Sequence, residues 1–359
     1  MLPKGLMNLR NRFLAGIMLT VLAIGCGGNN AISGTRGVED YVGTQQPGDV
    51  WAWSIGASTF TASNETLSHT YAGDVMNLPS GFTKLTISST NDSAVSVGTQ
   101  AYSIEIPGTC LLVKPAGSEF VSPIIATGLG SNPTAQTLAM NWITIPSADF
   151  DVQNSDAFGT ANFTKTQAGY DAAIDFGKLD YSEGPLDQGS GATLVHQDGR
   201  YIIEGDDIVF GLQQSGVFMA DFGPNLGGII GMQAPTRSIP WPEIAGKTFI
   251  GMMAESGRTQ LITVKPGIAP DTLQGDGLVT DTEISTGINT GSGDGGVTLE
   301  LLSTVSNGLF AVNLNYGENG NNNERMFFVA GEVEGKIVLF GFAGNAQNGT
   351  YNVLLVEKQ

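Results

Sequence analysis

The sequence predicts an all-β protein with two or three antiparallel β-sandwich or β-barrel modules in tandem, preceded by a signal segment and a flexible tether. Short apolar and β-branched runs recur between Gly, Asn, Asp and Pro turns, whereas helical periodicity is almost absent. Charged residues make up only 14% of the 359 residues and Gly numbers 50, as is usual in turn-rich β structure. A chain of this length is too long for one ordinary core.

The first element is a leader in residues 1–25. Basic residues precede an apolar run at residues 13–24, which ends at Gly25 and Cys26. A positive start, a short apolar stretch and a small residue at the cleavage point are typical of a secretory signal peptide. The run is too short for a comfortable membrane span, which needs about 20 residues. The basic residues are Lys4, Arg10 and Arg12.

Residues 22–26, Leu-Ala-Ile-Gly-Cys, resemble the lipobox of bacterial lipoproteins. The resemblance covers the leader only. It implies that the Cys26 thiol is acylated, with palmitate as an expected chain, and becomes the first residue of the mature protein. Ala23 departs from the family pattern, which usually has Leu, Val or Ile there. Ordinary secretion with cleavage near Gly25 and an uncleaved anchor helix therefore stay open.

The same resemblance indicates a location. Gly27 carries no signal for retention in the inner membrane, unlike an aspartate at that position. We expect an outer-membrane protein, anchored through Cys26 and facing the periplasm or the cell surface. Residues 26–47 are polar and glycine-rich, with too few large apolar groups to offset the entropy of ordering, and they predict a lipidated tether.

Net charge excludes some partners. Removal of the leader leaves 13 of the 16 basic residues against 34 acidic ones, a net charge near −21. Nucleic acid needs clustered Lys and Arg, so we expect no nucleic-acid partner. Broad adhesion to anionic lipid headgroups is disfavoured for the same reason. The membrane is then reached through the lipid alone, and an extracellular ligand or envelope partner stays unidentified.

The body divides into three predicted modules. A β-sandwich is expected at residues 48–131, a barrel-like module at 132–242, and a second barrel-like module at 243–359. Prolines near residues 132–133 and 240–242 mark the boundaries, because Pro interrupts strand ladders. Units of about 100 residues suit small sandwiches or barrels.

Individual strands and turns follow the same patterns. An Asp-Gly turn is expected at residues 198–199 and a Glu-Gly turn at 334–335. The run at residues 350–357 resembles the closing strand of a lipocalin-like barrel, at the level of fold only. Further strands are expected at residues 50–55, 83–88, 201–204, 208–212, 261–264, 309–314 and 336–342.

A repeat underlies the last two modules in one interpretation. Phe218 and Phe328 begin two similar short motifs that lie about 110 residues apart. Two further similar motifs, which end at Gly231 and Gly341, have the same separation. A further set of similar segments carries Trp142, Phe249 and Tyr351. Two related β modules would produce this pattern. Chance similarity between glycine-punctuated strands stays open.

Few residues offer chemistry. Cys110 is expected at a buried strand position, and lipidation of Cys26 would leave it without a disulfide partner. His69 is expected on a strand face with Leu67 and Tyr71, and His196 at an exposed turn. We interpret both histidines as incidental. The sequence has no G-x-S-x-G, H-E-x-x-H, P-loop or C-x-x-C motif, so we expect no enzyme and no cofactor.

Acidic loops and tryptophans are the remaining candidates. Weak calcium candidates lie in glycine-rich loops, without EF-hand spacing, and solvated loops are the competing interpretation. Trp51 and Trp53 share one strand face, where core packing is favoured over a sugar-binding platform. Trp241 is expected as a plug between the second and third modules. The calcium candidates are Asp206, Asp207, Asp276, Asp281 and Asp294.

The leading hypothesis is a non-enzymatic, surface-tethered lipoprotein with a binding or envelope-structural role. A lipocalin-like carrier of a small apolar ligand is the alternative. A hydrolase acting through paired carboxylates is a third possibility, although the 34 acidic residues do not locate such a pair.

Overall fold

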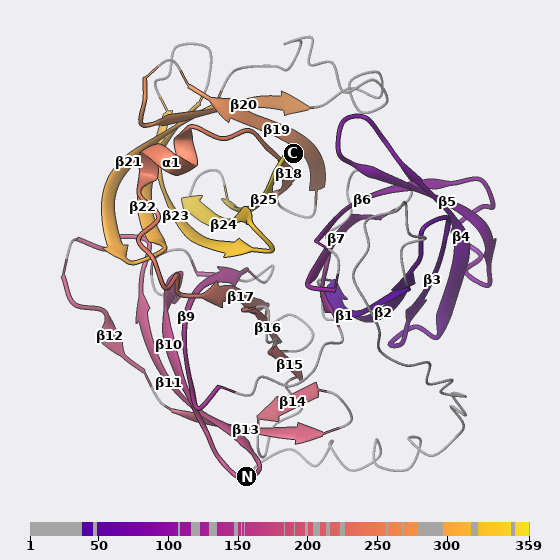
Figure 1. Ribbon diagram of the computed structural model, residues 1–359, viewed down its shortest axis with the longest axis horizontal. Helices are drawn as coiled ribbons and strands as arrows, with labels where there is room; N and C mark the ends of the chain where they lie inside the picture. Colours follow the sequence, from indigo (N-terminus) through magenta and orange to yellow (C-terminus); the bar gives the residue numbers. More distant parts are fainter. Residues whose placement is uncertain are drawn as a thin grey trace, which may run out of the picture. The chain divides into compact units, whose positions relative to one another are not determined.

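The computed structural model shows an all-β protein, as predicted (Figure 1). Residues 36–359 form one compact unit. Only α1 (Trp241–Ala245) is helical among the described residues, and no helix there is long and apolar enough to cross a membrane. The structure describes residues 38–358 except 46–48, 107, 116–122, 129–134, 147–149, 152, 154, 183, 190, 198–199, 204–208, 213–215, 223–226, 256–257, 268, 279–296, 317–321 and 346–348.

The first module is a closed barrel in which each strand pairs antiparallel with its neighbours in the chain and β8 returns to β1. It was expected as a sandwich, but the pairing of first and last strands closes a single sheet. The strands are β1 (Glu39–Gln45), β2 (Asp49–Ile55), β3 (Thr59–Asn64), β4 (His69–Asn77), β5 (Thr83–Thr90), β6 (Gln100–Ile106), β7 (Cys110–Lys114) and β8 (Ile124–Gly128).

The predicted tether is too long at its C-terminal end. Strand β1 lies inside the interval 26–47, paired with β2 on one side and β8 on the other. Tyr41 is fully buried in the barrel and Val42 is nearly so. The segment has few apolar residues of its own, and its order depends on two ladders of backbone hydrogen bonds that sequence composition does not reveal.

The second module is a nine-stranded antiparallel sheet whose pairing also returns on itself. Strand β17 pairs with β9, and β10 pairs with both β9 and β11, so eight strands follow one another in a ring with β12 attached to β11. The strands are β9 (Thr137–Ile145), β10 (Phe158–Lys165), β11 (Gly169–Gly177), β12 (Asp187–Gln188), β13 (Ala192–Gln197), β14 (Arg200–Ile203), β15 (Val209–Leu212), β16 (Val217–Asp221) and β17 (Gly228–Gln233).

The third module is a closed barrel, and its last strand pairs with its first. The expected closing strand is therefore confirmed. The Glu-Gly turn between Val333 and Lys336 is confirmed too, with positive φ at both turn residues. The strands are β18 (Phe249–Glu255), β19 (Arg258–Pro266), β20 (Thr272–Leu278), β21 (Val297–Ser306), β22 (Leu309–Tyr316), β23 (Asn322–Val333), β24 (Lys336–Asn345) and β25 (Gly349–Glu357).

Two segments of the proposed repeat share a local Phe–Gly arrangement. Phe218 on β16 is the register partner of Gly231 on β17, and Phe328 on β23 is the register partner of Gly341 on β24. Both phenylalanines are buried inside their own modules. The strands differ in place, because β17 is the last strand of its module and pairs with the first, β9, whereas β24 pairs with β23 and β25. A duplication of the second and third modules therefore stays a prediction.

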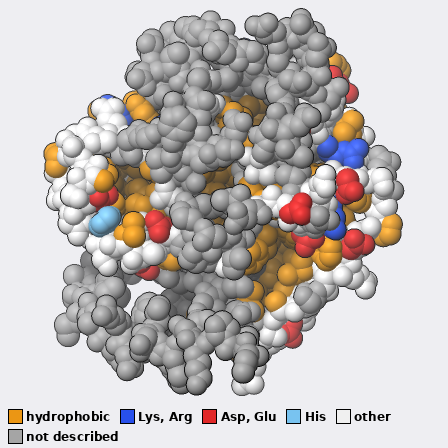
Figure 2. Space-filling model, turned by 180° about the vertical axis from the view of Figure 1, so that it is seen from behind, with side chains coloured by type: hydrophobic (Ala, Val, Ile, Leu, Met, Phe, Trp, Pro, Cys, Tyr) orange, Lys and Arg blue, Asp and Glu red, His pale blue; other side chains and the backbone are white. Residues whose placement is uncertain are grey.

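Four apolar clusters hold the described residues together. Three of them fill the interiors of the individual modules. The fourth and largest joins residues of all three, with Ile104 of β6, Phe158 of β10 and Phe340 of β24 among its members. Both faces of many strands are therefore buried, one inside a module and the other against its neighbours. On the face shown in Figure 2, acidic and hydrophobic side chains are interspersed, and basic side chains are sparse.

Candidate functional site

Several predicted site residues lie outside the described residues. Cys26 is one, and four of the calcium candidates are others: Asp206, Asp207, Asp281 and Asp294. Asp276 lies on β20, but its side chain is not described. Within the described part of the chain, no group of three or more His, Cys, Asp and Glu side chains is arranged to hold a metal ion. The calcium site thus stays a prediction.

Cys110 begins β7 with its side chain 2% exposed, as predicted. Burial raises the pKa of its thiol to about 12, because the thiolate would lose its hydration inside the apolar cluster between modules. The neutral thiol is the stable form at physiological pH. Cys110 therefore packs as a small apolar side chain.

His196 is not at an exposed turn. It lies on β13 as the register partner of Tyr201, with its ring centroid 5.1 Å from the tyrosine ring, and it is half-buried. Burial raises the pKa of the Tyr201 hydroxyl to about 12. The Asp-Gly signal at residues 198–199 led us to expect His196 in the turn. Strand β13 instead continues to Gln197, so His196 lies within the strand.

One end of the first barrel carries a polar cluster around Asp92. The Tyr71 hydroxyl donates to Asp92 Oδ2 at 2.8 Å, and His69 Nδ1 lies 3.5 Å from the same oxygen. A backbone bond from Ala94, followed by the Tyr71 bond, holds the pKa of the Asp92 carboxyl below its usual value. Burial raises the pKa of the Tyr71 hydroxyl, and the bond to Asp92 adds to this. Leu67, expected on the strand face, instead lies in the turn before β4 and is 54% exposed.

A His–Asp pair is two thirds of a nucleophilic triad, but the chemistry of this cluster is different. The hydroxyl that approaches it belongs to Tyr71 and donates to the carboxylate, whereas the hydroxyl of a nucleophile would donate to the imidazole. Asn64 donates to Asp49 nearby, at 2.9 Å. The cluster closes one end of the barrel with satisfied polar groups. Nothing among the described residues points to catalysis.

Trp51 and Trp53 face the inside of the first barrel, where sequence analysis favoured them as core residues. Their rings stack at 5.7 Å, and Tyr71 and Phe60 extend the stack at 5.5 Å and 5.9 Å. Both indoles are more than nine-tenths buried. A flat sugar platform on the surface is therefore wrong for these two residues.

Trp241 is a plug, but of the third barrel's own interior. It opens α1 after Pro240 and packs against Phe310 and Phe328 at centroid distances of 5.6 Å and 6.4 Å. Its indole N–H donates to the Asp271 carbonyl. Pro242 suits the first turn of a helix, where a missing N–H is not needed. Trp241 thus lies between β17 and β18 in the chain, and its ring contacts belong to the third barrel.

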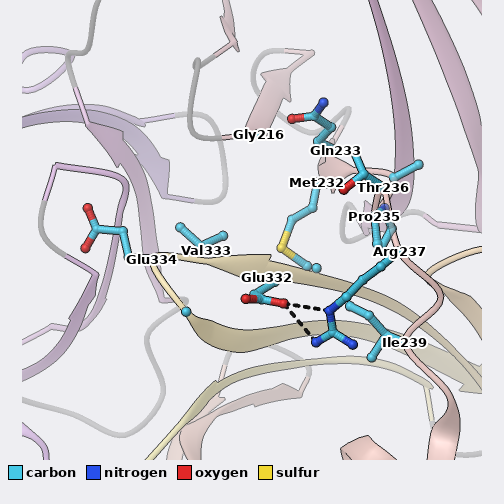
Figure 3. A pocket seen from close by; sticks show the side chains of 13 residues that line it. Gly216, Met232, Gln233, Pro235, Thr236, Arg237, Ile239, Glu332, Val333 and Glu334 are labelled. Atoms are coloured by element: carbon cyan, nitrogen blue, oxygen red, sulfur yellow. Dashed lines mark hydrogen bonds and ion pairs between the residues drawn. The ribbon is translucent and has the colours of Figure 1, made fainter.

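One pocket lined by described residues has a volume of about 460 Å³ and is shown in Figure 3. Its walls come from the end of β17, the segment that follows it, and the β23–β24 turn. Figure 3 shows Arg237 and Glu332 turned toward each other, whereas Glu334 points away. Met232 packs over Gly331 with its sulfur 3.1 Å from the position that a Cβ would take.

All five N–H groups of Arg237 are engaged. Nε and Nη2 donate to Glu332 Oε2, Nη1 and Nη2 donate to the two oxygens of Glu243, and Nη1 also donates to the Ser238 carbonyl. The hydrogen bonds that Arg237 donates to Glu243 and Glu332 raise the pKa of the guanidinium. No donor is left for an anionic ligand, so this arrangement is a clamp between the connecting segment, α1 and β23. No sequence motif indicated it, because the three residues are paired only by the fold.

Comparison of the chain with models of known protein families finds no match, and comparison with curated proteins finds no matching relative.

Proposed function

We propose that this protein is a lipid-anchored, non-enzymatic lipoprotein of the outer membrane that serves as a rigid structural or binding body. The shared apolar cluster carries the proposal, because it joins outward-facing residues of all three modules. Tandem domains with polar surfaces move relative to one another, whereas a large apolar interface holds them fixed. The leader ending in Cys26 supports attachment of this body to a membrane.

Polar contacts add to the rigidity between the second and third modules. Asn141 donates to the Asn307 carbonyl at 2.8 Å, and Asn352 donates to the Thr144 carbonyl at 2.9 Å. The second of these contacts is buried, where a hydrogen bond is costly to break. The Arg237 clamp lies at the same junction.

A scaffold is favoured over a lipocalin-like carrier because the third barrel is filled. Phe310, Phe328 and Leu339 occupy its interior, together with the Trp241 plug. An eight-stranded barrel has room for side chains or for one small ligand. Here the side chains take that room.

Anchoring is tested with globomycin, which blocks lipoprotein signal cleavage, and with the Cys26→Ser variant. We expect an unprocessed precursor in both cases, and palmitate labelling of the wild-type chain only. Normal maturation of the variant would refute lipidation.

Rigidity is tested on the purified full chain by calorimetry, monitored in parallel by near-ultraviolet circular dichroism. We expect one cooperative transition at the same temperature with both probes. Separate transitions for separate modules would contradict a rigid body while leaving the anchor unaffected.

A further inference from the structure

Three buried side-chain donor groups in the first barrel have no hydrogen-bond partner among the described residues: the indole N–H groups of Trp51 and Trp53 and the hydroxyl of Ser103. The side chains of Trp51 and Trp53 are 7% and 6% exposed, and Ser103 is fully buried. Native proteins rarely leave such groups unpaired, because each costs the free energy of its lost hydration. Three in one interior indicate an occupant.

The three groups face the same interior. Trp51 and Trp53 alternate with outward residues on β2 and belong to the barrel's internal cluster. Ser103 lies between the inward Ala101 and the inward-reaching Glu105 on β6. In a ring of eight strands, β2 and β6 are four apart in both directions, so they stand on opposite sides of the barrel (Figure 1).

A side chain that spans this interior connects the two sides. Tyr41 is the register partner of Trp53, and its hydroxyl donates to Glu105 Oε1 and accepts from the Gly108 N–H at 3.1 Å. Tyr41 therefore links the wall that carries Trp53 to the inward face of β6 that carries Ser103 and Glu105.

We propose that the interior of the first barrel is a binding site for a small neutral group with an acceptor oxygen, held by Trp51, Trp53 and Ser103. Two indoles only donate, so the occupant must accept, and the Ser103 hydroxyl can donate or accept. The Glu105 carboxylate on the same strand face disfavours an anion. A water molecule, or a hydroxyl or ether oxygen of a small molecule, supplies the acceptor that the two indoles require. This site does not depend on the proposed anchoring or rigidity.

The other two tryptophans provide an internal reference. Trp142 donates to the Thr160 carbonyl at 3.3 Å, and Trp241 donates to the Asp271 carbonyl, so both indoles are paired within the protein. Nuclear magnetic resonance of the full chain with ¹⁵N-labelled tryptophan resolves four indole N–H groups. Trp51→Phe and Trp53→Phe variants assign the two of interest.

The expected result is a long-lived nuclear Overhauser contact from the Trp51 and Trp53 indoles to a bound species, absent for Trp142 and Trp241. Contact to water protons identifies a water, whereas contact to carbon-bound protons, with a matching mass released on denaturation, identifies a small molecule. Indoles that show neither contact would overturn the proposal.

A second measurement uses Ser103→Ala, with the exposed Ser89→Ala as its control. An occupied site loses a hydrogen bond, so the melting temperature of Ser103→Ala falls by a few degrees while that of the control stays unchanged. If the interior is empty, the same substitution removes an unpaired buried hydroxyl, which stabilises the fold. A rise in melting temperature would therefore refute the site.

Discussion

The ring of Phe328 lies across the backbone of Gly341, its register partner on the next strand, so closely that a Cβ on the glycine would come within 2.5 Å of the ring. Phe218 and Gly231 have the same relationship in the second module, at 2.2 Å. In both places a glycine creates the space that an interior aromatic ring occupies. This packing gives a physical reason for glycine at the positions that the sequence repeat aligns.

Substitution of this glycine tests the packing. Gly341→Ala forces the Phe328 ring from its place, and we expect a loss of about 1–3 kcal/mol in unfolding free energy, as for other overpacked cores. Gly184→Ala is the control, because Gly184 is exposed and its added Cβ meets only an ordinary contact at 3.4 Å. Urea denaturation measures both. Equal midpoints for the two variants would contradict the packing argument.

Trp241 is expected to be the most costly side chain to truncate at the end of the third barrel. Trp241→Ala leaves a cavity beside Phe310 and Phe328 and removes the donor to the Asp271 carbonyl. We expect a loss of about 3–5 kcal/mol. Trp241→Phe keeps much of the volume and should lose less. Comparable losses for the two variants would mean that the ring's volume is not what closes the barrel.

Cys110 should react with thiol reagents only after unfolding. Burial and the raised pKa, to about 12, suppress both access and the thiolate form. The measurement is iodoacetamide labelling of Cys26→Ser, in which Cys110 is the only thiol, with and without denaturant. Rapid labelling of the folded chain would contradict burial between the modules.

The Arg237 clamp should stabilise the fold only above acidic pH. The Arg237 hydrogen bond lowers the pKa of Glu243, so its carboxylate binds fewer protons in the folded state than in the unfolded chain. Its contribution is then present above the ordinary glutamate pKa of about 4.3 and is lost as pH falls through the lowered value.

The comparison is the urea midpoint of wild type and Glu243→Gln at pH 7 and at pH 3. We expect a small difference at pH 7, because the pair is partly exposed, and convergence at pH 3. A difference that persists at pH 3 would assign the effect to packing rather than charge.

Local patterns predicted much of the fold. The positive φ values of Glu334 and Gly335 follow from the two-residue turn that the sequence indicated. Alternation placed Trp51 and Trp53 on one face, and that face is the barrel interior. These features depend on neighbours in the chain, so short sequence windows contain them.

The candidate site was less predictable. The clamp joins Arg237 to Glu332, 95 residues away, and the Tyr71–Asp92 hydrogen bond joins residues that are 21 apart in the chain. Strand β1 was not predicted, because it is held in place by pairing with β2 and β8 and its own composition does not indicate a strand. Such pairings depend on the register of strands distant in sequence, which composition and periodicity do not specify.

The sequence by itself determined that this is a β protein, since short apolar runs such as residues 337–342 recur between turn residues without helical periodicity. It also supplies the expectation of an anchor at Cys26. Only the tertiary structure decided which face meets which partner. On β24, Leu339 points into its own barrel while Phe340 joins the cluster shared by all three modules. Both faces of this strand are buried and apolar, so the sequence does not distinguish them. Closure of the barrel decides which face lines its interior and which face packs against the other modules.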